Sequence, residues 1–493
     1  MRCVIAGVIT GLGLLGLFLS SVEYVNAASF MGLGDRPGGT FLSEAFSIST
    51  DGTTIVGRSF SALGSEAFRW TASEGMVGLG DLPGGNFFSQ AEGVSADGTV
   101  VVGRSSSVSG TEAFRWTASE GMVGLGILPG GIGSGARAVS ADGTVVVGDG
   151  GYEAFRWTTS DGMRGLGFLP GGAHISTAYA VSADGTIVVG EGNSAFGEEA
   201  FRWTASEGMV GLGDLPGAGF SSEARGISAD GMVIVGVGSS ASGPAFRWTA
   251  SEGMVSLGDL PGGNFSSEAL AVSADGTVIV GWGETSPGVR EAFIWNPIRG
   301  MRRLSDVLST QSGLAAALTG WTLIVATGIS GDGLTISGYG INPSGDREAW
   351  IAQLDALEPD NDNDTISDGE DVCPDTVIPE PVPTERLGVN RFALTNPDGI
   401  FDTVAPRGKG PQKVFTIADT AGCSCEQIID ALGLGKGHKK FGCSISTMED
   451  WIAGLLPPQP HGDNDDNDRD NHKEKEKGKN EASDDWQHGK QKD

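Results

Sequence analysis

The chain has 493 residues, of which 81 are glycine, and it carries a formal charge of −30 with a sequence pI near 4.4. It contains 32 lysines and arginines against 62 aspartates and glutamates. Affinity for nucleic acid depends on clusters of basic residues that neutralise phosphates. The composition therefore argues against a nucleic-acid partner.

Residues 1–27 have the pattern of a signal peptide. Arg2 precedes an uncharged apolar run over residues 3–21, and Val25 and Ala27 occupy positions −3 and −1 of a cleavage site. The run could instead serve as a membrane anchor, but its glycine content and small-residue exit favour cleavage. We expect a secreted protein, extracellular or at the cell surface, without a transmembrane segment once the signal peptide is removed.

Residues 29–357 contain a repeated unit. The string EAFRWTASEGMVGLGDLPGG recurs with small changes, and its Asp-Gly steps lie 42 to 46 residues apart until the last. In the sixth unit, strand patterns fall at 268–273, 277–280, 291–295 and 301–304. Four strands in about 45 residues are typical of a β-propeller blade. An Asp-Gly step at the first hairpin of each unit marks seven units, at Asp51, Asp97, Asp142, Asp184, Asp230, Asp275 and Asp332.

The two ends of the repeat region complement each other. Residues 30–35 (FMGLGD) match the last strand of a unit, and residues 348–354 (EAWIAQL) match a third strand with no last strand after it. A closed ring lets the N-terminal segment complete the seventh unit, whereas a linear solenoid leaves both ends incomplete. The sequence therefore predicts an all-β fold, a seven-bladed propeller closed by the N-terminal strand, rather than a β-solenoid.

Residues 112–130 (EAFRWTASEGMVGLGILPG) resemble the HAF-type extracellular repeats of bacteria, which carry an aromatic strand, a GLG-like strand and a Gly-Gly turn in this order. The resemblance covers about residues 29–355. It implies export and a repeat scaffold but no agreed biochemical activity. The histidine of the family motif is replaced here by Glu66, Glu112, Glu153, Glu199 and Glu291.

The repeated residues favour structural roles over catalysis. Phe68 and Trp70 share one face of their strand and should fill the core between blades, while Arg69 on the other face should hold a neighbouring turn or carboxylate. An active site needs different groups around one atom, which a ring of equivalents does not supply. Departures from the repeat are mostly serine, glycine, asparagine and alanine, so we do not expect an enzyme.

One rim of the propeller should gather the LPGG loops and the serine-rich and glycine-rich loops before each EAF string. Such adaptable loops suit contacts with a protein or a glycan, although a solvated rim without a ligand is an equal alternative. Residues 304–318 interrupt the seventh unit with a helical leucine spacing. We expect a short helix there, and this break in symmetry is a candidate for specific binding.

Residues 358–376 contain acidic side chains at the spacing of a calcium loop. Counted from Asp360, the acids occupy positions 1, 3, 5, 9 and 12, with a backbone carbonyl at position 7. The expected Ca²⁺ ligands are Asp360, Asp362, Asp364, Ile366, Asp368 and Asp371. The segment, with its following Cys-Pro step, is similar to a thrombospondin type-3 calcium repeat. We expect weak binding, on the order of 10⁻⁴ to 10⁻³ M; the alternative is a solvated acidic linker.

The C-terminal third contains a Pro-rich linker (377–385), a small α+β module (386–456) and a charged tail (457–493) that we expect to be disordered. Four cysteines remain after signal removal, and export favours two disulfides of unknown pairing over a zinc site with His438. These cysteines are Cys373, Cys423, Cys425 and Cys443.

Three classes of function fit these features. The favoured class is a secreted calcium-binding adhesion or interaction scaffold whose propeller rim binds an unknown protein or glycan. The second is a secreted propeller enzyme such as a lyase or a glycosidase, and the third is a structural protein of the envelope or matrix.

Overall fold

The computed structural model describes residues 28–355, apart from 218, 239–242 and 311. In the C-terminal region it describes residues 373, 376, 387, 389–394, 400–403, 413, 415–421, 423–432 and 442–455. The chain divides into two compact units, Met1–Glu370 and Asp371–Asp493. Among the described residues, no helix is long and apolar enough to cross a membrane.

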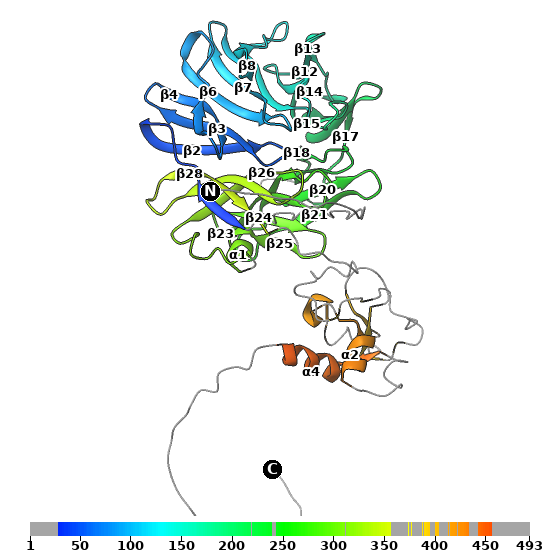
Figure 1. Cartoon of the computed structure of the whole chain (residues 1–493). Helices are drawn as coiled ribbons and strands as arrows, with labels where there is room; N and C mark the ends of the chain where they lie inside the picture. Colours follow the sequence, from blue (N-terminus) through cyan, green and yellow to red (C-terminus); the bar gives the residue numbers. More distant parts are fainter. Residues whose placement is uncertain are drawn as a thin grey trace, which may run out of the picture. The chain divides into compact units, whose positions relative to one another are not determined.

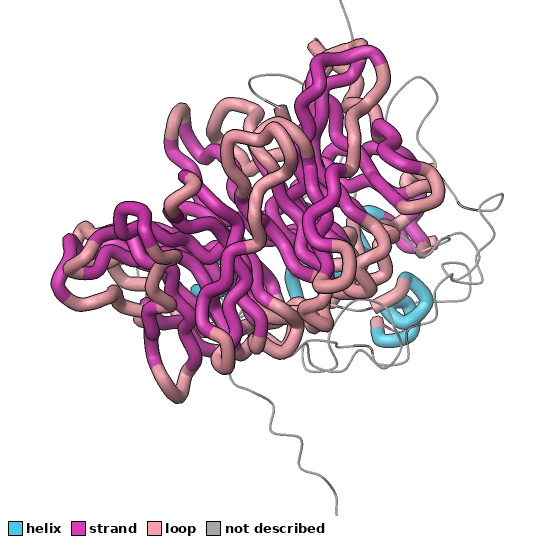
Figure 2. The backbone as a smooth tube through the Cα atoms, turned by 90° about the horizontal axis from the view of Figure 1, so that it is seen from above, coloured by secondary structure: helices cyan, strands magenta, loops and turns pink. Residues whose placement is uncertain are grey.

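The first unit consists of seven antiparallel sheets, each of four strands, and strands joined by short loops dominate it (Figure 2). Blade 1 contains β2 (Gly38–Ile48), β3 (Thr54–Ser61), β4 (Gly64–Thr71) and β5 (Gly75–Gly78). Blade 2 contains β6 (Gly84–Val94), β7 (Val100–Ser107), β8 (Gly110–Thr117) and β9 (Gly121–Gly124). Blade 3 contains β10 (Gly135–Val139), β11 (Val145–Asp149), β12 (Ala154–Thr158) and β13 (Gly162–Gly165).

The next three blades repeat this order. Blade 4 contains β14 (Gly171–Val181), β15 (Val188–Ser194), β16 (Glu198–Thr204) and β17 (Gly208–Gly211). Blade 5 contains β18 (Ser222–Ile227), β19 (Ile234–Gly238), β20 (Ala245–Thr249) and β21 (Gly253–Gly258). Blade 6 contains β22 (Ser267–Val272), β23 (Ile279–Ser286), β24 (Val289–Asn296) and β25 (Gly300–Arg303).

The seventh blade joins the two ends of the propeller sequence. It contains β26 (Thr322–Ile329), β27 (Thr335–Ile341) and β28 (Arg347–Gln353), and its outer strand is β1 (Ser29–Gly32). β1 pairs antiparallel with β28, from Ser29 opposite Gln353 to Gly32 opposite Trp350, and Figure 1 shows this blue strand among the yellow-green strands. The seven-bladed propeller and its N-terminal closure are therefore confirmed.

A ring of backbone hydrogen bonds links the blades at the Asp-Gly turns. In each turn, one N–H donates to the carbonyl oxygen of the equivalent turn in a neighbouring blade. The donors and acceptors are Asp51–Ala96, Ala96–Ala141, Ala141–Ala183, Ala183–Ala229, Ala229–Ala274, Ala274–Gly331 and Gly331–Thr50. The last bond, 2.8 Å long, joins blade 7 to blade 1 and closes the ring.

The repeated aromatic residues fill the core between blades, as predicted. The phenylalanines of the third strands and Trp350, which replaces the phenylalanine in blade 7, are fully buried. Phe201, for example, packs against Val145 and Val147 of the preceding blade. The repeated arginine also takes its predicted role, because Arg69 binds the Glu74 carboxylate (2.8 Å) and the Gly98 carbonyl oxygen (3.2 Å).

Buried serines two residues before the buried alanine of the first strands tie neighbouring blades together. Ser89 Oγ accepts a hydrogen bond from the N–H of Ala67 (2.9 Å) and donates one to the carbonyl oxygen of Gly80 (2.5 Å), both in the preceding blade. Equivalent bridges are made by Ser43, Ser134, Ser176, Ser222 and Ser267. These hydroxyls are therefore structural groups rather than ligand contacts.

The glutamate two residues before the repeated phenylalanine constrains the outer strand beside it. Glu66 Oε1 accepts a hydrogen bond from the N–H of Gly80 at 3.2 Å, and a Cβ atom on Gly78 would overlap the same carboxylate. Blade 5 departs at both positions. Pro244 replaces the glutamate, and Ser256 occupies the glycine position, where its hydroxyl accepts from Gly258 N–H at 3.1 Å.

The insertion in the seventh unit forms a short helix, as expected. α1 (Leu304–Thr310) follows β25, and its buried Leu304 and Leu308 pack in the core cluster that contains Trp350. Gly313 adopts a left-handed φ of 64°, which a helix cannot accommodate. The insertion therefore contains the expected short helix, which covers only its first part.

The described part of the second unit contains a small sheet, ordered β30-β29-β31, and short helices. Its elements are β29 (Arg391–Ala393), β30 (Asp402–Thr403), η2 (Ala418–Thr420), α2 (Cys425–Ala431), β31 (Cys443–Ser444) and α4 (Ile445–Leu455). Disulfides join Cys373 to Cys423 and Cys425 to Cys443. The two predicted disulfides are thus confirmed with a defined pairing, which leaves none of these four thiols for zinc.

Candidate binding surface

The first strands of neighbouring blades contact one another in a closed ring around the propeller axis. In each of these strands a small residue is buried, as Ala45 is in blade 1, and the residues on either side of it point to the opposite face. These two flanking positions vary widely among the blades. They hold Glu44 and Phe46, Gln90 and Glu92, Gly135 and Arg137, Thr177 and Tyr179, Glu223 and Arg225, Glu268 and Leu270, and Val325 and Thr327.

The second strands supply the partners of these residues. The pairing places Arg58 opposite Glu44, Glu191 opposite Thr177 and Trp282 opposite Glu268. We refer to the resulting set of polar and aromatic side chains as the inner-strand network. Its members are Glu44, Arg58, Glu92, Arg104, Arg137, Asp149, Tyr179, Glu191, Glu223, Arg225, Glu268, Trp282, Arg290 and Arg347.

Two clusters of this network join adjacent blades through arginines. The Glu44 carboxylate pairs with Arg58 of its own blade and with Arg347 of blade 7, each at 2.6 Å. Arg137 of blade 3 pairs with Glu92 of blade 2 at 3.4 Å. Burial raises the pKa of Glu92 even though Arg137 and Arg104 oppose that shift.

The third cluster spans blades 4, 5 and 6 around a single arginine. The Arg225 guanidinium lies 4.2 Å from the centroid of the Tyr179 ring and pairs with Glu268 (2.9 Å) and with Glu223. Tyr179 donates a hydrogen bond to Glu191 Oε1 at 2.6 Å. Burial, together with the nearby carboxylates, raises the pKa of Glu223 to about 7 against the opposing effect of Arg225.

The LPGG rim comprises the loops after the fourth strands and the turns between the second and third strands. It exposes large apolar side chains on several separate loops, including Val108 (81% exposed) and Phe196 (75% exposed). Among the described residues, the full set on this rim is Leu63, Val108, Ile132, Tyr152, Ile175, Phe196, Phe265 and Val289. Among the described residues of the opposite rim, which carries the Asp-Gly turns, the comparable side chains are Met232 and Ile298.

This asymmetry identifies the LPGG rim as a candidate interaction surface, because apolar side chains gathered on one face of a soluble protein mark contact sites. The Phe196 and Phe220 rings contact each other, with centroids 5.5 Å apart. The polar inner-strand network lies toward the same rim, since Glu223 and Glu268 are the second residues of β18 and β22 and the Asp-Gly turns follow the ends of these strands. The candidate surface therefore combines apolar loop tips with a charged centre.

The predicted calcium ligands lie outside the described residues. This holds for Asp360, Asp362, Asp364, Ile366, Asp368 and Asp371. The calcium loop therefore stays a prediction. Within the part of the chain that the structure describes, no group of three or more histidine, cysteine, aspartate and glutamate side chains could hold a metal ion.

The inner-strand network was missed by the sequence analysis, which described the departures from the repeat as mostly small residues. That description is wrong for the two positions that flank the buried alanine. Aligning the strings SEAFSIS, SQAEGVS, STAYAVS and SEARGIS shows charged and aromatic residues in these two columns while the rest stays nearly constant. Variation confined to these two columns of the alignment was the sequence signal that could have revealed the network.

The fold defines the class of this protein as a β-propeller. No protein-family model and no curated protein matches the chain, so its resemblances to HAF-type repeats and to a thrombospondin type-3 repeat stay predictions.

Solved structures with a similar fold include TolB from Acinetobacter baumannii, with 14% identity and a TM-score of 0.32 over 46% of this chain. The match spans about half of that TolB chain, 53% of its length. An oligogalacturonate lyase in complex with manganese has 13% identity and a TM-score of 0.41 over 66% of this chain and 96% of its own. A chain of the mitotic checkpoint complex has 12% identity and a TM-score of 0.40 over 70% of this chain and 98% of its own.

Proposed function

We propose that this chain is an exported propeller that binds a partner protein on its LPGG rim. The main observation behind this proposal is the number of exposed large apolar side chains on the two rims. Among the described residues, the LPGG rim has eight and the opposite rim has two. Leu63, Val108 and Ile132 are aliphatic and lie on separate loop tips. Aliphatic tips suit the apolar patches of a protein surface, and this favours a protein over a glycan.

The inner-strand network supports a binding rather than a catalytic function. Its carboxylates at Glu44, Glu92 and Glu268 are paired with arginines, an arrangement that fixes charged groups in position. Charged groups held in this way orient a partner and exclude wrong ones. We therefore expect the rim to supply contact area and the network to supply specificity.

The test is binding of the full mature chain to isolated cell envelopes, compared with binding to glycan arrays. Replacing Leu63, Val108 and Phe196 together by serine should weaken envelope binding at least tenfold, since these side chains are exposed and their loss should spare the fold. The matched control replaces Met232 and Ile298 on the opposite rim and should bind normally. Equal binding by both variants contradicts the proposal, and binding that survives protease treatment of the envelopes indicates a glycan.

We also propose that residues 358–376 bind Ca²⁺ as a structural ion and that residues 1–27 direct export. The disulfide between Cys373 and Cys423 supports the calcium proposal, because it anchors, within the second unit, the residue two positions after Asp371, the last expected ligand. Bound Ca²⁺ should slow protease cleavage between residues 358 and 385, and EDTA should speed it. Changing Asp362 and Asp364 together to alanine should remove this difference; equal cleavage rates in wild-type protein indicate a simple acidic linker.

A further inference from the structure

The apolar side chains of the LPGG rim gather on blades 3, 4 and 5. One column of the repeat contributes to this difference. The residue after the GLG or SLG string is Ile127 in the loop that enters blade 3 and Phe168 in the loop that enters blade 4. In the other four loops the same position holds Asp35, Asp81, Asp214 and Asp259. Two adjacent loops therefore carry an apolar side chain in place of a carboxylate.

Neighbouring loops extend this apolar surface, which we refer to as the apolar arc. The Phe168 ring stacks on His174, the neighbour of Ile175, with 4.8 Å between the ring centroids. The N–H of Ser176 donates to the carbonyl oxygen of Tyr152 at 3.0 Å, which holds these two loops together. The arc comprises Ile132, Tyr152, Phe168, Ile175, Phe196 and Phe220.

Close contacts join the two ends of the arc to its centre. At one end, a Cβ atom on Gly151 would lie 3.2 Å from the Ile132 nitrogen, so the loop of Tyr152 lies against Ile132. At the other end, the start of β14 pairs with β15 at the hairpin that carries Phe196, and the Phe196 ring contacts Phe220. The arc is therefore continuous across three blades.

Acidic side chains border the arc. Glu198 follows the hairpin of Phe196, and its carboxylate accepts a hydrogen bond from Ser221 Oγ at 3.4 Å, directly after Phe220. Glu191, in the third cluster of the inner-strand network, accepts its hydrogen bond from a tyrosine rather than from a cation. Within the described part of the chain, neither glutamate forms an ion pair.

The third cluster, taken with Glu198, also differs from the other clusters in its balance of charge. The first cluster has one carboxylate for two arginines, and the second has two carboxylates for two arginines. The third has four carboxylates around Arg225: Glu191, Glu198, Glu223 and Glu268. Burial and the other three carboxylates raise the pKa of Glu223 although Arg225 opposes this shift. The region beside the arc therefore carries an excess of negative charge.

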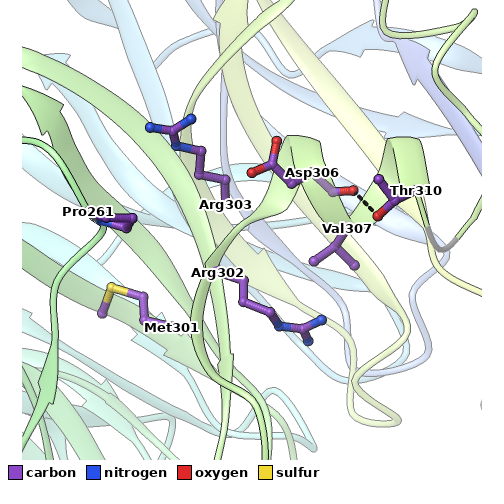
Figure 3. A pocket seen from close by; sticks show the side chains of 7 residues that line it. All are labelled: Pro261, Met301, Arg302, Arg303, Asp306, Val307 and Thr310. Carbon is purple, nitrogen blue, oxygen red and sulfur yellow. Dashed lines mark hydrogen bonds between the residues drawn. The ribbon is translucent and has the colours of Figure 1, made fainter. Parts of the chain in front are cut away.

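The blade 6 side of the rim has exposed apolar residues without this excess. Arg290 follows Val289 and lies 3.6 Å from the centroid of the Trp282 ring. Arg302 and Arg303 line a pocket of about 480 Å³ beside β25 and α1, where their side chains extend apart (Figure 3). Positive charge on a partner is therefore directed to the apolar arc rather than to blade 6.

We propose that the apolar arc binds a basic amphipathic segment of the partner protein. Apolar side chains of that segment pack on the arc, and its lysines or arginines face the carboxylates of the third cluster. Apolar contacts supply the buried area of such a complex, and complementary charges orient it. This inference rests on the proposed function, because it specifies where on the LPGG rim the partner binds and which chemistry the partner carries.

The experiment measures binding of the full mature chain to synthetic peptides by fluorescence anisotropy. The first peptide contains leucine and lysine in an amphipathic helical pattern. A second peptide replaces each lysine by glutamate, and a third replaces each leucine by serine. The leucine-lysine peptide should bind at least about tenfold more tightly than either of the others, because it alone supplies both apolar contacts and positive charge. Equal binding of the leucine-lysine peptide and either of the others overturns the inference.

Two sets of variants locate the binding site on the rim. Replacing Ile132, Tyr152 and Phe196 together by serine should weaken binding of the leucine-lysine peptide at least about tenfold. The matched control makes the same change on other blades of the LPGG rim and should bind normally; it replaces Leu63, Val108 and Phe265. All six side chains are more than half exposed, so neither set threatens the fold.

A charge variant tests the acidic border separately. Glu198→Gln should weaken binding of the leucine-lysine peptide several-fold, whereas Glu207→Gln, at an exposed carboxylate of the same blade on the opposite rim, should leave it unchanged. Peptide binding that the arc variant leaves intact, or that the control set weakens equally, overturns the inference. Self-association of the wild-type chain that the arc variant abolishes also overturns it, because the arc is then an interface between copies. The proposed function is decided independently, by binding to cell envelopes.

Discussion

Phe30 in the first strand of the propeller packs edge-on against Trp321 in the last blade, with 5.2 Å between the ring centroids. The same ring lies 6.1 Å from Trp350, the fully buried aromatic residue of β28. Immediately before this strand, the N–H of Ala28 donates to Asp355 Oδ1 at 2.7 Å. Side-chain packing and backbone pairing therefore fasten the start of the propeller to its end.

This closure predicts a specific loss of stability. Phe30→Ala should lower the free energy of unfolding by about 2 kcal/mol, because a half-buried ring loses its aromatic contacts. Met31→Ala is the control on the same strand, since Met31 is 50% exposed. Urea titration measures both. Deleting residues 30–35 should expose the edge of β28 and cause aggregation, and a deletion mutant that melts like wild type contradicts this role for β1.

The repeat made the fold predictable, because each unit carries the same strand and turn pattern and the two incomplete ends match each other. The end of α1 was less predictable. Leucines continue at helical spacing through Leu318, but the left-handed Gly313 stops the helix earlier. Local periodicity does not report that conformation, so the leucine spacing predicted a short helix but not the residue at which it ends.

The inner-strand network was harder to predict than the fold. Arg347 and Glu44 form an ion pair although they lie in the last and first blades, and only ring closure brings them together. Arg137 and Glu92 are likewise joined across two blades. Strong repetition draws attention to what is constant, whereas these residues stand in the columns that vary. The disulfide pairing also required three-dimensional structure, since four cysteines allow three pairings.

The close packing of the Glu66 carboxylate over Gly78 predicts a compensating pair of substitutions. Gly78→Ser should destabilise blade 1 by about 2 kcal/mol, because its Cβ overlaps the Glu66 carboxylate. Adding Glu66→Ala should restore part of this loss, since blade 5 accommodates Ser256 beside Pro244. A double-mutant cycle by urea unfolding measures the coupling. If the two substitutions change the free energy of unfolding additively, there is no coupling and the prediction is contradicted.

The serine bridges predict that removing one small hydroxyl group lowers the free energy of unfolding. Ser89→Ala removes the hydroxyl that satisfies the N–H of Ala67 and the carbonyl oxygen of Gly80. Leaving two buried backbone groups without partners should cost about 1–3 kcal/mol. Ser109→Ala in the exposed turn of the next hairpin is the control and should cost little. Thermal unfolding compares the two, and equal melting temperatures would disprove the bridging role.

The third cluster of the inner-strand network predicts how stability depends on pH. Burial raises the pKa of Glu223 from 4.5 to about 7 in the folded protein. Between these two values the folded state binds more protons than the unfolded state, so the free energy of unfolding should fall as the pH rises from 5 to 8. The groups that act on Glu223 are Arg225, Glu191, Glu268 and Glu198.

The size of this effect should be about 1–2 kcal/mol, less than the full shift implies, because the Glu223 side chain is 23% exposed and solvent screens it. Glu223→Gln should flatten the decline and make the protein more stable than wild type at pH 8, while Arg225 keeps its pair with Glu268. Part of the slope should remain, since burial also raises the pKa of Glu92.

Glu252→Gln, at an exposed carboxylate on the opposite rim, should keep the wild-type slope. Chemical denaturation at pH 5, 6.5 and 8 measures all three proteins, and parallel slopes for wild type and Glu223→Gln would show that this carboxylate stays ionised throughout.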